Sequence, residues 1–388
     1  MELPHKDSPN LHLVVATQEE LLQQQNDNSG EWKGALSLEA YLRREEVLLQ
    51  LDLTKDGGLT PWMLVHQPPN AVRTVLCGCE SLKKKALVAK DGKVRDVVAH
   101  GVASVFCPPK YRGKGYAGVM MSKVAQRLQK WQVGDGNAEF SILFSDIGKE
   151  FYTARGWQPF PSCHVSLPAK AELGEGLATS KVESGDYEEL CADDQQLLRK
   201  RLQAMSSSGR TAVALLPDVT TLHWHQARED FVARELHSGN ANVMAGGRGA
   251  MVKMDDGFRA WCYWTRVWTN PQEEAPNTLH ILRVVVEGEG HYDFGPASED
   301  GLKKVQNTSA VKAVSALFQA AQLAAHQAGM NEVQIWNPTS TTLAAVKLLD
   351  ANSATVEREK ESITSLLWYG EGSWEDVDWV CNEKYGWC

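Results

Sequence analysis

Residues 102–128 combine an apolar run, two prolines, a basic glycine-rich turn and a helical pattern, in the order VASVFCPPKYRGKGYAGVMMSKVAQRL. A turn between a strand and a helix can bind phosphate, because the unpaired amides and the dipole of a helix N-terminus both favour an anion. Glycine at positions 113 and 115 allows positive φ and close approach of the backbone, and the small Ala117 leaves space for a ligand. The turn therefore predicts a pyrophosphate site at Arg112, Gly113, Lys114, Gly115, Tyr116, Ala117 and Gly118.

Residues 113–118 also fit G-x-G-x-x-G, the fingerprint of dinucleotide-binding domains. In those domains the strand runs almost directly into the first glycine, and an acidic residue follows about twenty positions later. Here residues 108–112 intervene, and the next strand would end near Asp146, later than that spacing requires. The spacing disfavours a Rossmann domain. A basic surface turn in front of an ordinary helix remains the simplest alternative.

A frame that starts at Arg112 gives Arg-x-x-Gly-x-Ala, which resembles the R/Q-x-x-G-x-G/A signature of the GNAT acetyltransferases. A second block, SDIGKEFYTARGW at 145–157, resembles the later GNAT motif N-x-x-A-x-x-[LF]-Y-x-x-x-G-[FW] at Phe151, Tyr152, Gly156 and Trp157. It departs from that motif at Ser145, where the family has an asparagine that bonds the pantetheine arm. The resemblance covers about residues 10–168 and implies acetyl-CoA as cosubstrate.

A narrower resemblance extends over the whole chain. The stretch LFSDIGKEFYTARGW followed by PFPS, the large second half and the closing NEKYGWC are similar to the fungal lysine N6-acetyltransferases that begin lysine breakdown. This likeness implies transfer of an acetyl group to the ε-amine of free L-lysine by direct attack in a ternary complex. Two alternatives stay open: another primary amine (a polyamine or a peptide lysine), or a non-catalytic CoA-binding sensor.

The resemblance also implies roles for single residues. The splayed end of the fourth strand supplies oxyanion donors in GNAT enzymes, and here it corresponds to Val105, Phe106 and Cys107. Pro108 and Pro109 suit that position because proline ends strand pairing. Tyr152 corresponds to the tyrosine that acts as general acid toward the departing sulfur, and the less favoured alternative is a core tyrosine with a satisfied hydroxyl.

The residue that accepts the proton of the amine is the open question. His100 has a suitable intrinsic pKa, but strict strand alternation points it away from Val105 unless a bulge intervenes. Asp146 follows the next strand and could hold the ammonium or relay its proton, or merely cap a helix. Both are candidate catalytic residues in addition to Tyr152.

Other polar motifs favour simpler interpretations. Cys107 is expected to be a small strand-end residue rather than an acyl-accepting nucleophile, because no histidine lies close in sequence. The run Lys83–Lys85 could meet the 3′-phosphate of CoA, but charge runs are usually solvated. His223 and His225 lack further ligands nearby, and none of the eight cysteines forms a CxxC pair, so we expect no metal.

Composition limits the class of protein. The 388 residues carry a net charge of −9, which argues against nucleic-acid binding and mildly favours a cationic partner. No basic and apolar leader and no long apolar stretch is present, so we expect a cytoplasmic protein without membrane association. The oligomeric state cannot be predicted.

Hydrophobic periodicity predicts an α/β (α+β) fold with mixed sheets, in which strands 75–88 and 97–106 form a hairpin before the phosphate turn. The order β-β-β-α-β-α-β recurs after residue 250, without R-x-x-G-x-A and with an acidic stretch, EGEGHYDFGPASEDGLKKVQN, where the first half is basic. We therefore expect a GNAT domain (1–170), a linker and connecting helix (171–210) and a degenerate GNAT-like domain (211–388) that covers a small-molecule amine site. The aromatic, acidic tail after residue 367 could either recognise a cation or pack between the domains.

Overall fold

The computed structural model describes residues 3–134, 136–205, 209–238, 240–288 and 295–387. Its first half contains elements in the predicted order, with one helix, α1, that the sequence pattern did not reveal because its buried positions are largely polar. The elements of this half are β1 (Leu11–Val15), α1 (Gln18–Trp32), α2 (Leu38–Leu49), β2 (Leu59–His66), β3 (Thr74–Lys90), β4 (Lys93–Phe106), α3 (Tyr116–Leu128), β5 (Phe140–Ser145), α4 (Glu150–Thr153) and β6 (Gln158–Pro159).

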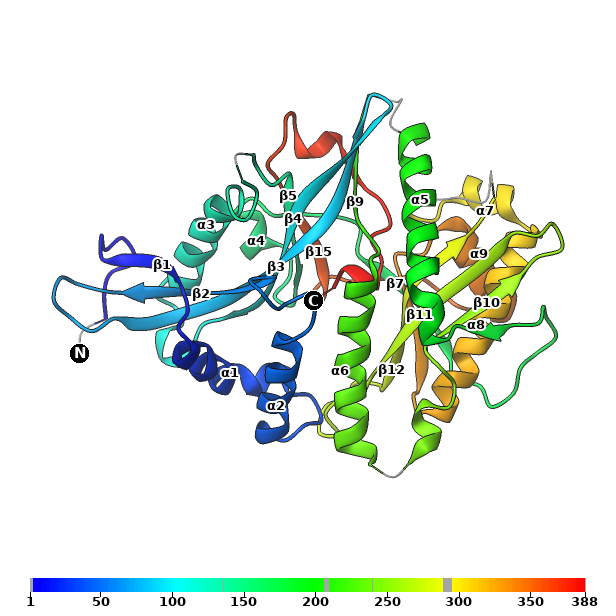
Figure 1. The fold of residues 1–388 in the computed structure, drawn as a ribbon, viewed down its shortest axis with the longest axis horizontal. Coiled ribbons are helices and arrows are strands. Elements are labelled where there is room, and N and C mark those ends of the chain that lie inside the picture. The colour runs from blue at the N-terminus through cyan, green and yellow to red at the C-terminus, as the bar shows by residue number, and fades with distance from the viewer. Residues whose placement is uncertain (1–2, 135, 206–208, 239, 289–294, 388) are drawn as a thin grey trace.

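The second half repeats this order after two long connecting helices, as Figure 1 shows. Its elements are β7 (Cys163–Pro168), β8 (Ser180–Lys181), α5 (Tyr187–Met205), β9 (Thr211–Leu215), α6 (Val219–His237), β10 (Gly249–Lys253), β11 (Arg259–Val267), β12 (Thr278–Val286), α7 (Glu299–Val305), α8 (Ser309–Gln327), β13 (Glu332–Trp336), α9 (Ser340–Leu349), β14 (Val356–Glu357), β15 (Ile363–Trp368) and β16 (Val377–Trp379). Part of the acidic stretch after β12, residues 289–294, lies outside the described residues.

Each half is built on a parallel strand pair inside a mixed sheet. In the first sheet the order is β1-β2-β3-β4-β5-β15-β6, and β4 and β5 run parallel. In the second sheet the order is β14-β7-β13-β12-β11-β10-β8, and β12 and β13 run parallel. A parallel pair needs a helical crossover, which α3 provides in the first half and α8 in the second.

The two halves exchange strands. β7 comes from the first half of the chain but pairs with β13 in the second sheet, whereas β15, near the C-terminus, pairs with β5 in the first. In Figure 1, β15 accordingly lies among the strands of the first half. A boundary at residue 170 follows the chain, but strand pairing crosses it at β7, at β15 and also at β9, which pairs with β3, so neither sheet is complete without the other half.

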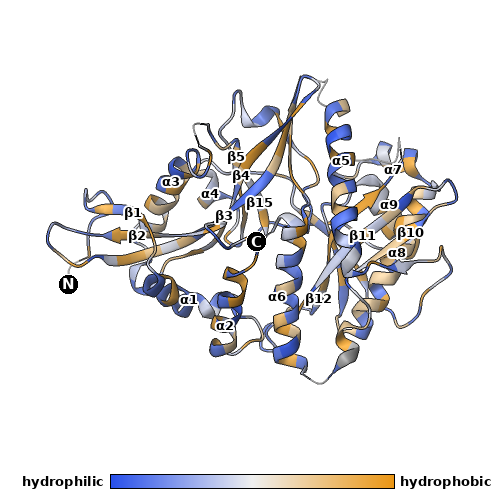
Figure 2. Ribbon diagram, viewed as in Figure 1, coloured by the Kyte–Doolittle hydropathy of each residue, from blue (hydrophilic) through white to orange (hydrophobic). Residues whose placement is uncertain are grey.

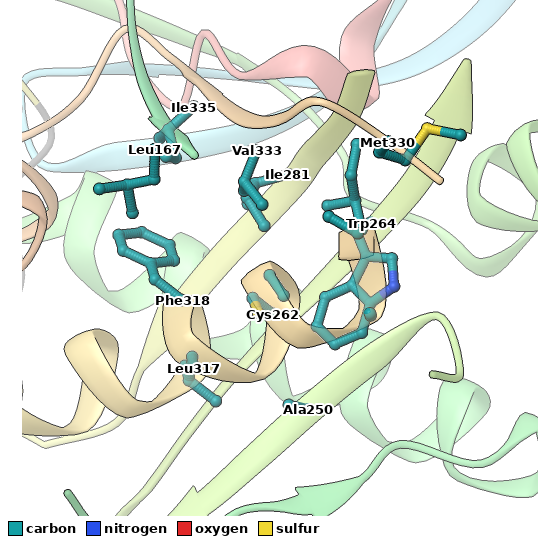
Figure 3. Packing of buried hydrophobic residues seen from close by; sticks show 14 of the residues in the cluster. Leu167, Ala250, Cys262, Trp264, Ile281, Leu317, Phe318, Met330, Val333 and Ile335 are labelled. Carbon is teal, nitrogen blue, oxygen red and sulfur yellow. The ribbon is translucent and has the colours of Figure 1, made fainter. Parts of the chain in front are cut away.

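Separate apolar cores lie on the sheet faces. In the second half, Phe318 of α8 lies close to Leu167 of β7 (Figure 3), and both belong to one core with Trp264, Ile281 and Val333 of the sheet. A core that includes Leu87, Phe140 and Leu366 joins the halves. Figure 2 shows α5 as mostly hydrophilic and α8 as more hydrophobic, which agrees with the twelve buried residues of α8. Among the described helices, none is long and apolar enough to cross a membrane.

Candidate active site

The N-terminus of α3 has the geometry of an anion site. Gly113 and Gly115 have φ values of 76° and 82°, in the left-handed region that glycine tolerates best. Gly115 is the N-cap of α3, and within the described chain no side chain caps this helix. The amides of the first helical turn have no partners within a helix, so they can bind a negatively charged group.

A basic hollow adjoins this turn. It has a volume of about 530 Å³ and is lined by Gly115 and Gly118, together with Lys6, Lys123 and Arg155. Arg155 stacks over the Phe151 ring at 3.9 Å, and its Nε is buried without a hydrogen-bond partner among the described residues. The same guanidinium donates through Nη1 to the Phe151 carbonyl oxygen, so the Arg155 side chain is held in place at the edge of the hollow.

The N-terminal arm of the chain lies over the same helix. The Tyr116 hydroxyl donates to the carbonyl oxygen of Pro4, and Lys6 Cδ lies 3.2 Å from the position of a Cβ added to Gly115. Lys6, Lys123 and Arg155 are candidate ligands that the sequence pattern did not single out. Only Lys123 could have been found from the sequence, because it lies in a polar helical stripe with Ser122 and Gln126.

The acyl position predicted at the end of β4 lies where two strands separate. The parallel pairing of β4 with β5 ends at Val102 and Leu143, although both strands continue. Two residues of β4, Ser104 and Val105, face the single residue Cys79 of β3, and Ser104 has a φ of 52°. This β-bulge bends the strand end and changes which side chains face each side of the sheet.

Tyr152 lies on the α3 side of the separated strands. It is buried in the core that contains Val105 and Cys79, and burial raises the pKa of its hydroxyl, with the nearby Cys79 and Asp146 adding to the effect. Its hydroxyl makes no hydrogen bond among the described residues. A protonated phenol with a free O–H can donate a proton to a group between β4 and β5.

Ser145 and Asp146 organise the turn after β5. The Ser145 hydroxyl donates to the carbonyl oxygen of Gly148 at 2.6 Å and accepts from the amide of Ile147 at 3.2 Å. Asp146 is exposed and accepts a hydrogen bond from the Ser362 amide at 2.9 Å, at the start of the exchanged strand β15. Both side chains thus hydrogen-bond to backbone groups, whether or not they also contact a substrate.

His100 lies away from the separated strands. The bulge at Ser104 lies between His100 and Val105 and brings the two side chains to the same, α3 side of the sheet, but His100 precedes the point where β4 and β5 separate. The ring is fully buried on the α3 side, 3.3 Å from Gln132 Oε1, and burial lowers its pKa to about 4. These contacts favour a structural histidine, and a role as base remains a prediction.

Cys107 and Arg112 connect the end of β4 to the phosphate turn. Arg112 Nε donates to the Cys107 carbonyl oxygen at 2.9 Å, and its guanidinium lies 5.5 Å from the centre of the Phe106 ring. A hydrogen bond with Cys77, helped by Arg112, lowers the pKa of the Cys107 thiol. By contrast, Lys83–Lys85 lie farther back along β3, paired with residues 98–100 and remote from α3.

Two curated proteins are related to the chain. The lysine acetyltransferase of Yarrowia lipolytica is 24% identical over 272 residues, which cover 60% of this chain and 67% of that protein. An uncharacterised protein of Saccharomyces cerevisiae is 25% identical over 176 residues, which cover 38% of this chain and 43% of that protein.

Solved structures share the fold. A GCN5-related N-acetyltransferase from Anabaena variabilis matches with a TM-score of 0.50 and 13% identity, over 92% of this chain and 72% of the other. The N-myristoyltransferase of Saccharomyces cerevisiae, solved with bound myristoyl-CoA, matches with a TM-score of 0.50 and 10% identity, over 94% of this chain and 84% of the other. These likenesses confirm the predicted GNAT-type α/β fold.

A family model for the LYC1 GNAT-like C-terminal domain matches residues 164–388. The match includes the second sheet and the exchanged strand β15, and it confirms the prediction that a second GNAT-like unit follows the first. Because the match spans more than half of the sequence, the chain belongs to this LYC1-like family of GNAT N-acetyltransferases.

Proposed function

We propose that this GNAT acetyltransferase transfers the acetyl group of acetyl-CoA to the ε-amine of free L-lysine. The observation that supports acyl-CoA binding best is the uncapped N-terminus of α3 beside a basic hollow, in a chain whose fold is shared with a myristoyl-CoA-binding enzyme. The lysine acceptor rests on the relationship to the Yarrowia lipolytica lysine acetyltransferase.

The residues present fit the cosubstrate. The first-turn amides of α3, with Arg112 and Lys114, would hold the pyrophosphate, and Lys6, Lys123 and Arg155 would meet the other phosphate oxygens. The pantetheine arm would lie between β4 and β5, beyond Val102 and Leu143. Acetyl-CoA supplies the activated acyl group, and the backbone at residues 105–107 would donate to its carbonyl oxygen.

Transfer requires a neutral amine and a protonated leaving group. The ε-amine of lysine has an ordinary pKa of about 10.4, so at neutral pH a base must remove a proton before the nitrogen can attack. The amine nitrogen then bonds to the acetyl carbon as the carbon–sulfur bond breaks. Tyr152 would donate its proton to the departing sulfur, and burial keeps that proton on the phenol until then.

One experiment tests this function against its alternatives. CoA release would be followed with acetyl-CoA and each of lysine, ornithine, spermidine and a lysine peptide, and mass spectrometry would locate the acetyl group. We expect N6-acetyllysine as the preferred product. Preference for the peptide or for spermidine would mean that this amine, and not free lysine, is the acceptor. Tight acetyl-CoA binding without turnover of any amine would favour a sensor.

A further inference from the structure

A buried carboxylate lies beside the β4 bulge, on the face of the sheet opposite to α3. Glu80 of β3 pairs with Ala103, and its Oε2 accepts a hydrogen bond of 2.7 Å from the Ser104 hydroxyl. Glu80 is only 8% exposed, and no cationic side chain among the described residues lies within ion-pair distance of its carboxylate. A buried carboxylate without a cationic partner is unfavourable, so its presence calls for a functional reason.

A hollow of about 440 Å³ opens next to this carboxylate. It lies between α1 and the ends of β3 and β4, where Gly78 and Phe106 form part of its wall. Gln24 of α1 also lines it: this side chain is 6% exposed, its Oε1 is buried without a partner among the described residues, and its Nε2 donates to the Ser104 carbonyl oxygen at 3.4 Å. Gln24 thus connects the wall of the hollow with the backbone of the bulge that carries Ser104.

The walls of the hollow suit a cation. Glu19, Glu20 and Asp27 of α1 line it, against a single lysine, Lys110. Arg73 pairs with Glu20, but it leaves Glu19 and Asp27 without a cationic partner among the described residues. A primary ammonium group would find acidic walls in this hollow, and Glu80 lies just beyond the wall, two residues after Gly78 on the same face of β3.

We propose that the hollow admits the cationic amine substrate and that Glu80, at the β4 bulge, is the base that removes its proton. The proposal rests on the acetyl transfer proposed above. The ammonium loses one proton to the Glu80 carboxylate, which later releases it to solvent. The nitrogen loses its second proton as the amide forms, and this loss balances the proton that Tyr152 gives to the sulfur of CoA.

The electrostatic surroundings agree with this role. Burial, and then the nearby carboxylate of Glu45, raise the pKa of Glu80 to about 7, although the Ser104 hydrogen bond lowers it. The charged and titratable groups that face this region are Tyr41, Arg44 and Glu45 of α2 and Arg228 of α6, and Arg44 is hydrogen-bonded to Glu45. Because the carboxylate form predominates above its pKa, kcat/KM should rise with pH through about 7.

The test uses the full chain with acetyl-CoA and lysine across pH 5.5–9.5, with acetyl-CoA affinity measured separately. Glu80→Gln retains the shape and the Ser104 contact, and we expect its kcat to fall about 100-fold or more with unchanged acetyl-CoA affinity. The inflection near pH 7 should disappear, so that the remaining rate follows only the neutral fraction of free lysine. Glu45→Gln is the matched control: it should retain most of kcat and move the inflection to lower pH.

The outcomes separate this inference from the proposed function. A Glu80→Gln enzyme with the wild-type rate and pH profile, beside an active wild type, would overturn the role of Glu80 alone. A wild type that binds acetyl-CoA but acetylates no amine would overturn both. If Glu80→Gln fails to fold, Glu80→Asp decides: we expect a lowered kcat with the inflection retained, and an unchanged kcat would count against the proposal.

Discussion

The two halves share one architecture, but their strand clefts differ. In each half a parallel pair separates after four paired residues, at Val102 and Leu143 in the first and at Ile281 and Ile335 in the second. In the second half the chain's own tail enters this separation. Glu383 accepts a hydrogen bond of 2.9 Å from the Val284 amide, and Asn337 Nδ2 donates to the Asn382 carbonyl oxygen at 2.6 Å.

The corresponding crossover helices differ in the same way. The N-terminus of α3 begins at an uncapped glycine, whereas Thr308 caps α8 and accepts from the Val311 amide. The second half thus satisfies within the protein the backbone donors that the first half leaves to a ligand. What remains beside the tail is a cavity of about 90 Å³, which is small for a nucleotide cosubstrate. Of these two crossover helices, only α3 combines an uncapped N-terminus with an adjoining basic hollow.

Among the variants that test this difference between the halves, Gly115→Val is expected to have the largest effect, a loss of acetyl-CoA affinity. A β-branched residue at φ 82° is strained, and its side chain would fill the turn and approach Lys6. We expect acetyl-CoA affinity to fall by about 1,000-fold, or about 4 kcal/mol. Calorimetric titration of the folded variant would measure it.

A matched variant separates strain from ligand contact. Gly92, at the β3–β4 turn, has a φ of 74° and open space around it, so Gly92→Val carries a similar strain far from α3. It should lose stability but retain acetyl-CoA affinity. Wild-type affinity in Gly115→Val would mean that the cosubstrate binds elsewhere.

Glu383→Ala removes the group that closes the second cleft. Arg283 would lose one of its two carboxylate partners, Asp194 being the other, and the Val284 amide would lose its acceptor. Breaking a buried pair costs about 3–5 kcal/mol, and since Asp194 remains we expect a loss near the lower end, measured by denaturant unfolding. The exposed Glu375→Ala is the control, with little expected change.

The same variant tests whether the second cleft is a dormant cosubstrate site. Its helix α8 remains capped by Thr308, so opening the cleft should not create a binding site for phosphate. We expect acetyl-CoA to bind with unchanged affinity and one site per chain. A second site in Glu383→Ala would show that the tail alone blocks it.

The sequence predicts the phosphate turn because that signal is local. Positive φ, an uncapped helix and basic charge all follow from residues 112–118, whatever surrounds them. The strand exchange could not be predicted, because the apolar alternation of β7 and the continuously buried residues of β15 would each suit either sheet. That choice depends on contacts between residues far apart in the chain.

Glu80 illustrates the same limit within the candidate site. It is a lone acidic residue in the apolar stretch TVLCGCESL, and this was the only signal in the sequence. The intrinsic pKa of an imidazole suggested His100, and the side to which it points could not be predicted because the bulge at Ser104 has no clear sequence mark. The bulge directs the Ser104 hydroxyl toward Glu80 and leaves His100 with Gln132.

Tyr152→Phe sharpens the comparison by testing the chemistry of the first cleft without altering its shape. Tyr152 makes no hydrogen bond among the described residues that its loss would break, and its ring would stay packed against Phe151. We expect kcat to fall by about 100-fold with unchanged acetyl-CoA affinity. The measurement is steady-state turnover with a pre-steady-state check that chemistry limits the rate. Unchanged kcat under that condition would remove Tyr152 from the mechanism.

Thr308→Ala has the smallest expected effect and tests the other side of the comparison. It removes the side-chain cap of α8, and a lost threonine cap typically costs about 1 kcal/mol of stability. The free amides at α8 would then resemble those at α3, but without the positive φ of Gly113 and Gly115 and without a basic hollow of the kind formed by Lys6, Lys123 and Arg155. We therefore expect a modest loss in denaturant unfolding, with both the affinity for acetyl-CoA and its one-site stoichiometry unchanged. If uncapping α8 created a second site, helix capping alone would distinguish the halves, and the glycines and cations of the first half would have a lesser role than we assign to them.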